Sequence, residues 1–299
     1  MSDTTASLRR KIDSAGELQS VVRTMKALAA SSIGQYEQSV RALGDYHRTV
    51  ELGLSICFRK SALAAAVPAR KGHADTATVG AIVFGSDQGL VGRFNDVVAD
   101  FAVTKLAALP GKLQVWAVGE RVYGRLFDAG LSPVGRFTVP TSIAGIAPLA
   151  GQILVDSEAH RDADDGGELH LFYNRPTAGA AFEPVTQRLL PLDDSWRRDL
   201  AELPWPTSNL PEVLGDHGDN TATLRALIRE YLFVSLFRAC AESLASENAS
   251  RLAAMQRADK NIDELLETYN GSFHRLRQSS IDEELFDVTS GFEALSTEK

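Results

Sequence analysis

A stretch of about seventy residues at the C-terminal end constrains the fold of this chain more than any other feature. From Asn220 to Ser290 it contains no proline and a single glycine, Gly271. Read as one α-helix, it would extend on the order of 100 Å, which is more than a single globular domain can bury. Its apolar residues recur three or four positions apart, which lays a stripe along one side of a helix. They include Leu224, Ile228, Tyr231, Ile262, Leu265, Tyr269, Phe273, Leu276, Ile281, Leu285 and Val288.

The N-terminal end of the chain offers a partner for this helix. Residues Thr4 to Phe58 also lack proline. Apolar and small residues there fall seven positions apart, and two of them are followed three positions later by another apolar residue. These positions are Leu8, Ala15, Val22 and Ala29, and then Leu18 and Met25. Because this is the a/d pattern of a coiled coil, we expect the chain ends to pair as a strut or an axle.

The middle of the chain alternates between strand-like and helix-like patterns. Strands are predicted at Val79–Phe84, Leu113–Val118, Glu168–Tyr173 and, at an edge, Phe182–Leu190. Helices are predicted at Asn95–Leu109, Glu120–Ala129 and Ile146–His160. Strands separated by helices of this length indicate βαβ units and a largely parallel sheet. Residues 61–75 are expected to be a linker, and residues 191–218 a loop.

The predicted fold class is therefore α/β. It combines a long antiparallel coiled coil of the N- and C-terminal helices with an inserted Rossmann-like α/β domain. The expected divisions are residues 1–60 for the first helix, 76–192 for the α/β domain, and 219–292 for the last helix, which packs with 1–60.

Composition excludes several classes of function. The net charge of −8 argues against a nucleic-acid binder, because phosphate contacts need clustered lysine and arginine. The two cysteines, Cys57 and Cys240, form no disulfide framework and are predicted to be core-facing thiols on the long helices. No apolar run approaches the roughly 18 residues of a membrane span, and the N-terminal residues lack the apolar core of a secretory signal. We therefore expect a bacterial cytoplasmic protein.

A glycine-rich turn, Gly85–Asn95, follows the first predicted strand and is the main candidate for a nucleotide site. A P-loop ends in Gly-Lys-Ser/Thr, whereas this turn ends in Gly92-Arg93-Phe94. The G-x-G-x-x-G spacing of dinucleotide sites is also missing, since the glycines here follow G-x-x-x-G-x-x-G. The favoured interpretation is a tight strand-to-helix turn, with a phosphate site as the minor alternative.

The remaining polar clusters point to no chemistry. The acidic residues Asp162, Asp164, Asp165 and Glu168 lack the twelve-residue pattern of a calcium loop and are interpreted as a solvated loop. The six histidines have no metal-ligand spacing, and no G-x-S-x-G elbow occurs. We predict no catalytic residue, no cofactor and no metal site.

Three segments give the chain its family resemblance. In the C-terminal helix, Ser246–Met255 resembles S-E-x-A-A-R-M-x-A-M, while Leu276–Ile281 and Glu283–Val288 resemble A-R-Q-A-x-I and Q-E-[IL]-x-E-I. The turn Ser86–Asn95 is similar to S-D-[RK]-G-L-C-G-x-[FL]-N. Near the N-terminus, Leu8–Ile12 and Thr24–Ser31 are similar to I-x-x-R-I and A-M-x-M-V-A-A-S. Together these segments resemble the gamma subunit of F-type ATP synthases.

The resemblance implies a central rotor shaft that couples proton or sodium flow to ATP synthesis or hydrolysis. Its terminal helices would form a coiled coil inside the ring of alpha and beta subunits, and its α/β domain would meet the epsilon subunit and the c-subunit ring. It would be a non-catalytic subunit that binds no nucleotide. Its place would be peripheral, on the cytoplasmic face of the bacterial inner membrane.

Four residues carry implied roles. Arg277 and Gln278 match the positions that hydrogen-bond a loop of one catalytic subunit, the contact called the catch; the alternative is a solvated helix face. Met25 and Lys26 match the neck, where the shaft meets the moving lever of the catalytic subunits; the alternatives are a coiled-coil seam for Met25 and an exposed charge for Lys26. Glu247, Asn248 and Arg251 are expected on a helix face, without assigned roles.

Departures from the family pattern leave other interpretations open. Ser32 and Val91 replace a common lysine and the usual cysteine, and no family motif is recognisable in residues 215–220. Such drift raises the hypothesis of a divergent second copy from a variant ATPase. Two rival classes are a free-standing coiled-coil adaptor with an α/β binding domain, and an α/β enzyme with its site at Gly85–Asn95.

Overall fold

The computed structural model describes residues 4–60, 78–159, 167–177, 182–192, 194–209 and 221–296. The predicted linker at 61–75, the residues Asp162, Asp164 and Asp165 of the acidic run, and the segment 215–220 lie outside these residues.

Two very long helices open and close the chain, as the proline-free stretches predict. Helix α1 spans Thr5–Lys60 and α6 spans Thr221–Ser296. Between them lie strands β1 (Thr78–Phe84), β2 (Lys112–Val118), β3 (Gly135–Phe137), β4 (Glu168–Pro176) and β5 (Phe182–Leu190). The shorter helices are α2 (Phe94–Leu106), α3 (Glu120–Asp128), the 3₁₀ turn η2 (Ile143–Gly145), α4 (Ile146–Ala159) and α5 (Asp194–Glu202).

The five strands form one sheet in the order β3-β2-β1-β4-β5. Strand β1 pairs in parallel with both β2 and β4, so that Ile82 lies opposite Trp116 on one side and Leu171 on the other. Strand β3 extends the parallel part, and β5 pairs antiparallel with β4 at the other edge. The predicted α/β fold class, with a largely parallel sheet and an edge strand at Phe182–Leu190, is confirmed.

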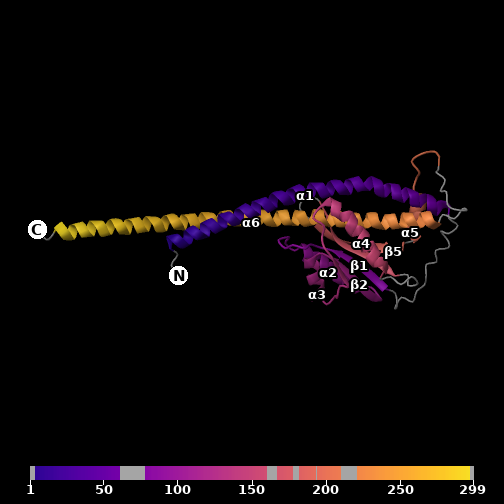
Figure 1. The fold of residues 1–299 in the computed structure, drawn as a ribbon, viewed down its shortest axis with the longest axis horizontal. Coiled ribbons are helices and arrows are strands. Elements are labelled where there is room, and N and C mark those ends of the chain that lie inside the picture. The colour runs from indigo at the N-terminus through magenta and orange to yellow at the C-terminus, as the bar shows by residue number, and fades with distance from the viewer. Residues whose placement is uncertain are drawn as a thin grey trace. The chain divides into compact units, whose positions relative to one another are not determined.

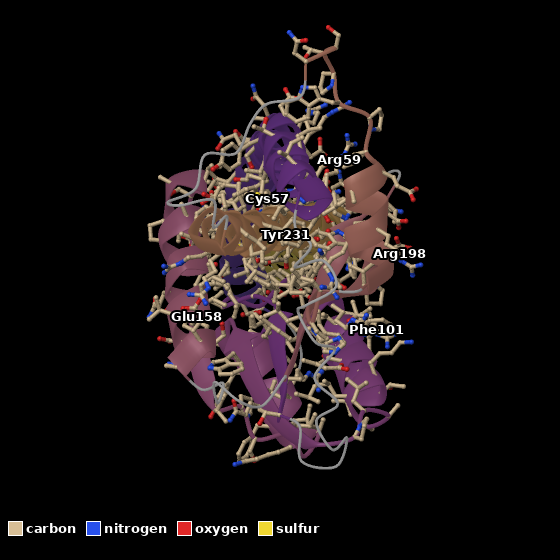
Figure 2. The ribbon with its side chains drawn as sticks, turned by 90° about the vertical axis from the view of Figure 1, so that its right-hand side faces the viewer. Cys57, Arg59, Phe101, Glu158, Arg198 and Tyr231 are labelled. Carbon is tan, nitrogen blue, oxygen red and sulfur yellow. The ribbon has the colours of Figure 1, made fainter. Side chains whose placement is uncertain are left out.

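Each face of the sheet has its own core. Alternate residues of β1 point to opposite faces, as the pleat requires: Val79, Ala81 and Val83 join α2 and α3 in one cluster. Ile82 and Phe84 join α4 and the long helices in the other. Figure 1 shows α2 and α3 on one side of the sheet, and Figure 2 places Phe101 of α2 away from Tyr231 of α6 and Cys57 of α1.

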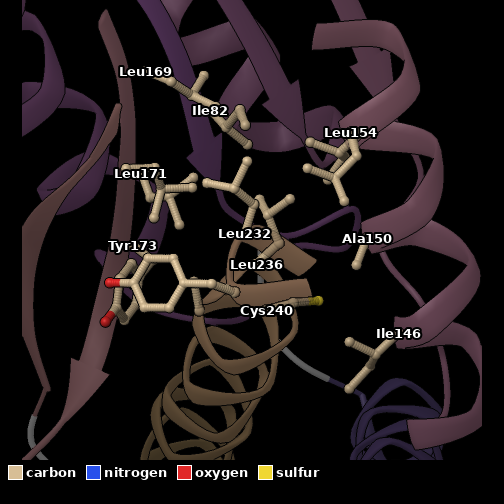
Figure 3. Packing of buried hydrophobic residues seen from close by; sticks show 14 of the residues in the cluster. Ile82, Ile146, Ala150, Leu154, Leu169, Leu171, Tyr173, Leu232, Leu236 and Cys240 are labelled. Carbon is tan, nitrogen blue, oxygen red and sulfur yellow. The ribbon is translucent and has the colours of Figure 1, made fainter. Parts of the chain in front are cut away.

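Helix α6 is deeply buried where it crosses the sheet. From Tyr231 to Glu247 only Arg238 is exposed, because α1, α4 and the sheet together surround this stretch. Figure 3 shows Leu232, Leu236 and Cys240 of α6 pointing toward the side chains of β4 and α4. Cys57 and Cys240 are both free, buried thiols, as predicted.

The chain divides into two compact units. One unit consists of residues 1–29 with 252–299, and the other of residues 30–251. The first unit is a pair of antiparallel helix segments, and the second holds the sheet with the remaining parts of α1 and α6. The predicted division at 1–60, 76–192 and 219–292 stays a prediction.

The coiled-coil seam of the first unit differs in detail from its prediction. Leu8, Val22 and Ala29 are buried as expected, but Leu18 is 55% exposed. All three residues four positions after Leu8, Ala15 and Val22 are half-buried, namely Ile12, Gln19 and Lys26, whereas three positions after them only Met25 is. On α6, likewise, Leu265 is 47% exposed while its neighbour Leu266 packs against the seam. The expectation for Leu18 and Leu265 is therefore wrong: periodicity finds the helix but not which flank its partner covers.

Part of the expected loop 191–218 is also corrected. Residues Asp194–Glu202 form helix α5, whose Trp196 packs on Tyr231 with ring centroids 4.8 Å apart. Arg59 at the end of α1 donates a hydrogen bond from Nε to the carbonyl oxygen of Ala201, at 2.6 Å. The proline-rich surroundings hid a short amphipathic helix that is stabilised by these tertiary contacts.

Gly119 provides a test of the turn between β2 and α3. Its φ is +119°, and a Cβ added there would lie 2.8 Å from the backbone of Ser86. Gly119→Ala is expected to lower the free energy of unfolding by about 1–3 kcal/mol, because the residue must adopt a strained backbone in a filled space. The control is Gly124→Ala, where nothing lies within 4 Å; it should stabilise α3 by up to about 1 kcal/mol. Urea unfolding of the full chain measures both variants, and equal changes would contradict the steric argument.

Candidate partner-binding sites on the long helices

The turn after β1 is held by its own side chains. The backbone N–H of buried Ser86 donates to Oδ1 of Asn95 at 2.9 Å, and Nδ2 of Asn95 donates to Oγ of Ser86 at 2.8 Å. A Cβ at Gly85 would lie 2.3 Å from Val122, so the first glycine permits close packing of β1 on α3. The favoured interpretation of a tight strand-to-helix turn agrees with this geometry.

Asp87 takes the place at this turn where an anion would bind. Its carboxylate accepts hydrogen bonds from the backbone N–H groups of Glu120 and Val139, each at 2.9 Å. Glu120 is the first residue of α3, and helix N-termini are the anion sites of nucleotide-binding folds. The Asp87 carboxylate therefore occupies the anion-binding position at the N-terminus of α3.

The cavity beside this turn has the wrong size and charge for a nucleotide. Its volume is about 210 Å³, below the roughly 300–1,000 Å³ of most small-molecule sites. Its lining includes the carboxylates of Asp87 and Glu247 and the guanidinium of Arg251. Burial raises the pKa of Glu247, while Arg251 opposes that shift. Within the described residues, no three histidine, cysteine or acidic side chains gather as metal ligands.

The motif at Ser246–Arg251 forms the joint between α6 and the sheet. Ser246 donates from Oγ to the carbonyl oxygen of Asn174 at 2.9 Å, and Ser250 donates to that of Val91 at 2.6 Å. Glu247 and Arg251 form an ion pair at 2.7 Å on the same stretch of helix. Sequence reasoning left Glu247 and Arg251 on a helix face and missed both serines. Their spacing of four, which places them on one face, is the signal that would have found them.

The two predicted neck residues lie in the helix pair of the first unit. Met25 is half-buried and packs against the cluster of Val22, Met255 and Ile262. Nζ of Lys26 lies 2.6 Å from Oδ2 of Asp259. The ammonium group of Lys26 is therefore engaged within the chain.

Asp259 is the central residue of this ion-pair cluster, and sequence reasoning missed it. Besides Lys26, it accepts a hydrogen bond from Nε of Arg23 at 3.2 Å. The hydrogen bond from Lys26, supported by Arg23, holds the pKa of Asp259 below its usual value. No pattern in one helix alone marks this residue, because its partners lie more than two hundred positions away.

The two predicted catch residues lie on a separate, open stretch of α6. Every residue from His274 to Ser290 is exposed, including Arg277 and Gln278. Among the described residues, the side chains of Arg277 and Gln278 make no hydrogen bond or ion pair. The stretch also exposes large apolar side chains, at Leu276 (38%), Ile281 (46%), Leu285 (58%), Phe286 (74%) and Val288 (71%). Apolar residues gathered on an exposed helix make this stretch a candidate surface for binding another protein. We call residues 274–290 the open segment.

Comparison with known proteins agrees with this architecture. A family described as ATP synthase matches residues 4–295. The ATP synthase gamma chain of Clavibacter michiganensis subsp. michiganensis is 29% identical over 299 residues, which cover 97% of each chain. That of Nitrosomonas eutropha is 26% identical over 300 residues, which cover 96% of this chain and 98% of the relative.

Solved structures share the fold. A chain of the Euglena gracilis mitochondrial ATP synthase, in the OSCP/F1/c-ring structure in rotational state 3, has a TM-score of 0.63 at 16% identity and covers 97% of this chain and 94% of that one. A chain of its rotor in rotational state 1 has a TM-score of 0.60 at 15% identity, with coverage of 93% and 98%.

Two very long helices at the ends of the chain, with a five-stranded α/β sheet between them in the sequence, define the fold class of this protein. The chain belongs to the ATP synthase family. Within that family its relatives are gamma chains, so the predicted resemblance is confirmed. Among the described residues, no helix has both the length and the apolarity to cross a membrane.

The bond network around Asp87 yields a stability prediction. Asp87→Ala is expected to lower the free energy of unfolding by about 1–3 kcal/mol, because the N–H groups of Glu120 and Val139 lose their acceptor. The control is Gln88→Ala at the neighbouring exposed position, which should change stability by less than about 0.5 kcal/mol. Denaturant unfolding of the full chain compares the two. An Asp87 variant as stable as the control would show that the carboxylate does not hold the turn.

The lowered pKa of Asp259 predicts a dependence on pH. A carboxyl group whose pKa falls on folding stabilises the protein above its unfolded pKa of about 3.9, and this stabilisation is lost as the pH falls through the folded pKa. Asp259→Asn should therefore lower stability at neutral pH, and the difference from wild type should vanish in acid. Unfolding from about pH 7 to about pH 2.5 measures this difference. Glu264→Gln, at an exposed acid on the same helix, is the control and should differ little from wild type in stability at any pH. A difference in stability between wild type and Asp259→Asn that persists in acid would contradict the ion-pair explanation.

Proposed function

We propose that this chain is the non-catalytic central rotor of an F-type ATP synthase. Its rotation would couple the flow of protons or sodium ions to ATP synthesis or hydrolysis in a ring of alpha and beta subunits. The observation that carries the proposal is the open segment of α6, an apolar and charged helix surface that the other described residues leave exposed. Family membership supports the same role.

The long helices are proposed to contact the ring at two places. Arg277 and Gln278, on the open segment, would hydrogen-bond a loop of one catalytic subunit. A planar guanidinium suits this task because it can hold a carboxylate through two parallel bonds. Met25 and Lys26 would form part of the neck, opposite the lever of the catalytic subunits. The exposure of Arg277 and Gln278 supports their availability to such a partner.

The α/β domain is proposed to meet the epsilon subunit and the c-subunit ring. The complex would lie peripherally on the cytoplasmic face of a bacterial inner membrane. The filled turn at Asp87 supports a chain that binds no nucleotide itself and acts on nucleotide sites elsewhere. In physical terms, each orientation of the rotor would favour a different conformation of each catalytic subunit, which couples rotation to nucleotide affinity.

Co-purification tests this proposal. The tagged full chain is expected to bring down the host's alpha and beta subunits as a complex with Mg-ATPase activity. A chain that runs alone on gel filtration and leaves alpha and beta unbound would overturn the rotor proposal and favour a free-standing coiled-coil adaptor. Binding of a small phosphorylated ligand by the isolated chain, measured by calorimetry, would instead favour an enzyme.

The catch residues can be tested within that complex. Arg277→Ala with Gln278→Ala is expected to lower ATPase activity by roughly tenfold, since a lost charge-assisted hydrogen bond costs about 1.5 kcal/mol or more; torque is expected to fall as well. The matched control is Ser279→Ala with Ser280→Ala, at the next two exposed positions. Activity that falls equally in both double variants, or in neither, would contradict a specific role for Arg277 and Gln278.

A further inference from the structure

A ladder of polar side chains joins the two helices of the first unit. Gln19, Arg23 and Lys26 project from α1 toward Asp259 and Asp263 of α6. The distances are 2.5 Å from Gln19 Nε2 to Asp263, 3.2 Å from Arg23 Nε to Asp259, and 2.6 Å from Lys26 Nζ to Asp259. The side chain of Asp259 is only 13% exposed, whereas that of Asp263 is 55% exposed. Asp259 is thus the shielded centre of the ladder.

The buried apolar cluster of the same seam is small. Its buried cluster consists of Val22, Met255 and Ile262, and most of the residues packed around it are alanines. Alanine side chains are small and similar to one another. A helix that shifted slightly along or around its partner would therefore bury a similar apolar area. In coiled coils a buried polar pair supplies the missing specificity, at some cost in stability, because only one alignment satisfies it.

The ladder also decides which face of α1 turns away from α6. In a heptad repeat the positions three and four after a seam residue fall on opposite flanks of the seam. Lys26 lies four residues after Val22, on the flank that faces Asp259. Met25 lies three after Val22, and on its flank Leu18, Val21 and Leu28 are 55%, 55% and 64% exposed. We call Leu18, Val21 and Leu28 the outer stripe; Met25, on the same flank, is half-buried and packs against the seam cluster.

We propose that Asp259 is a positioning residue: by holding Lys26 and Arg23 it fixes the rotation of α1 about its own axis, and so presents the outer stripe to the catalytic subunits. This inference rests on the proposed rotor function. It gives Lys26 an indirect role, because its ammonium group aligns α1 instead of reaching a neighbouring subunit.

The alignment itself can be tested on the full chain without partners. Spin labels at Val21→Cys and Asn261→Cys, both exposed positions, report the distance across the helix pair, while Cys57 and Cys240 are buried and unreactive. A single narrow distance distribution is expected for the otherwise wild-type chain. Asp259→Asn should broaden or shift it, while circular dichroism keeps its helical signal. The exchange Lys26→Asp with Asp259→Lys should restore the narrow distribution, and Glu264→Gln should leave it unchanged.

The functional consequence is tested in the assembled complex with alpha and beta subunits. Asp259→Asn is expected to assemble but to lose torque several-fold, with recovery in the exchanged pair. A distance distribution that stays narrow in Asp259→Asn, or torque that the exchange fails to restore, would overturn the positioning role. Failure of the wild-type chain to assemble would overturn the rotor function instead, while the spin-label result would still decide whether Asp259 aligns α1.

Discussion

The structure depends on how many neighbours cover α6 at each point along its length. Between Tyr231 and Glu247 the helix is enclosed by α1, α4 and the sheet, and nearly every residue is buried. From Met255 to Ile262 burial is confined to one stripe, as expected for a helix with a single partner. In the open segment, residues 274–290, no residue is buried. Along one continuous helix, burial therefore falls from an enclosed stretch to a stretch with a single partner helix, and then to a fully exposed stretch.

Hydrogen bonds attach the enclosed part of α6 to the α/β domain. Ser246 and Ser250 donate to backbone carbonyls of the α/β domain, and such bonds resist sliding of the helix along its axis more than apolar contacts do. Ser250 holds the turn after β1 to α6. Asp87, in the same turn, holds it to the first turn of α3. The residues that resemble a nucleotide-binding turn are thus used to attach a domain to a helix.

The sequence predicted the long helices, the parallel sheet and most of its elements because these follow from periodicity and from the positions of proline and glycine. It failed where the outcome depends on a distant partner. Leu18 fits a heptad as well as Gln19 does, and only the acidic residues on α6 decide which flank is covered. Helix α5 is too short to be specified locally and depends on contacts of Trp196 and Arg59. The roles of Arg277 and Gln278 were predicted from a motif and stay predictions, whereas Asp259 appears only once the helices are paired.

The weak seam of the first unit follows from the same burial pattern. A helix pair with a large apolar seam would be stable alone, and the seam would fix which faces point outward. If those outward faces were also strongly apolar, such a pair would tend to aggregate. Here the cluster around Val22 is small, and the polar ladder supplies alignment. Leu18, Val21 and Leu28 remain outside and exposed. Under the proposed rotor function, this exposed apolar area would help to stabilise a complex with the catalytic subunits.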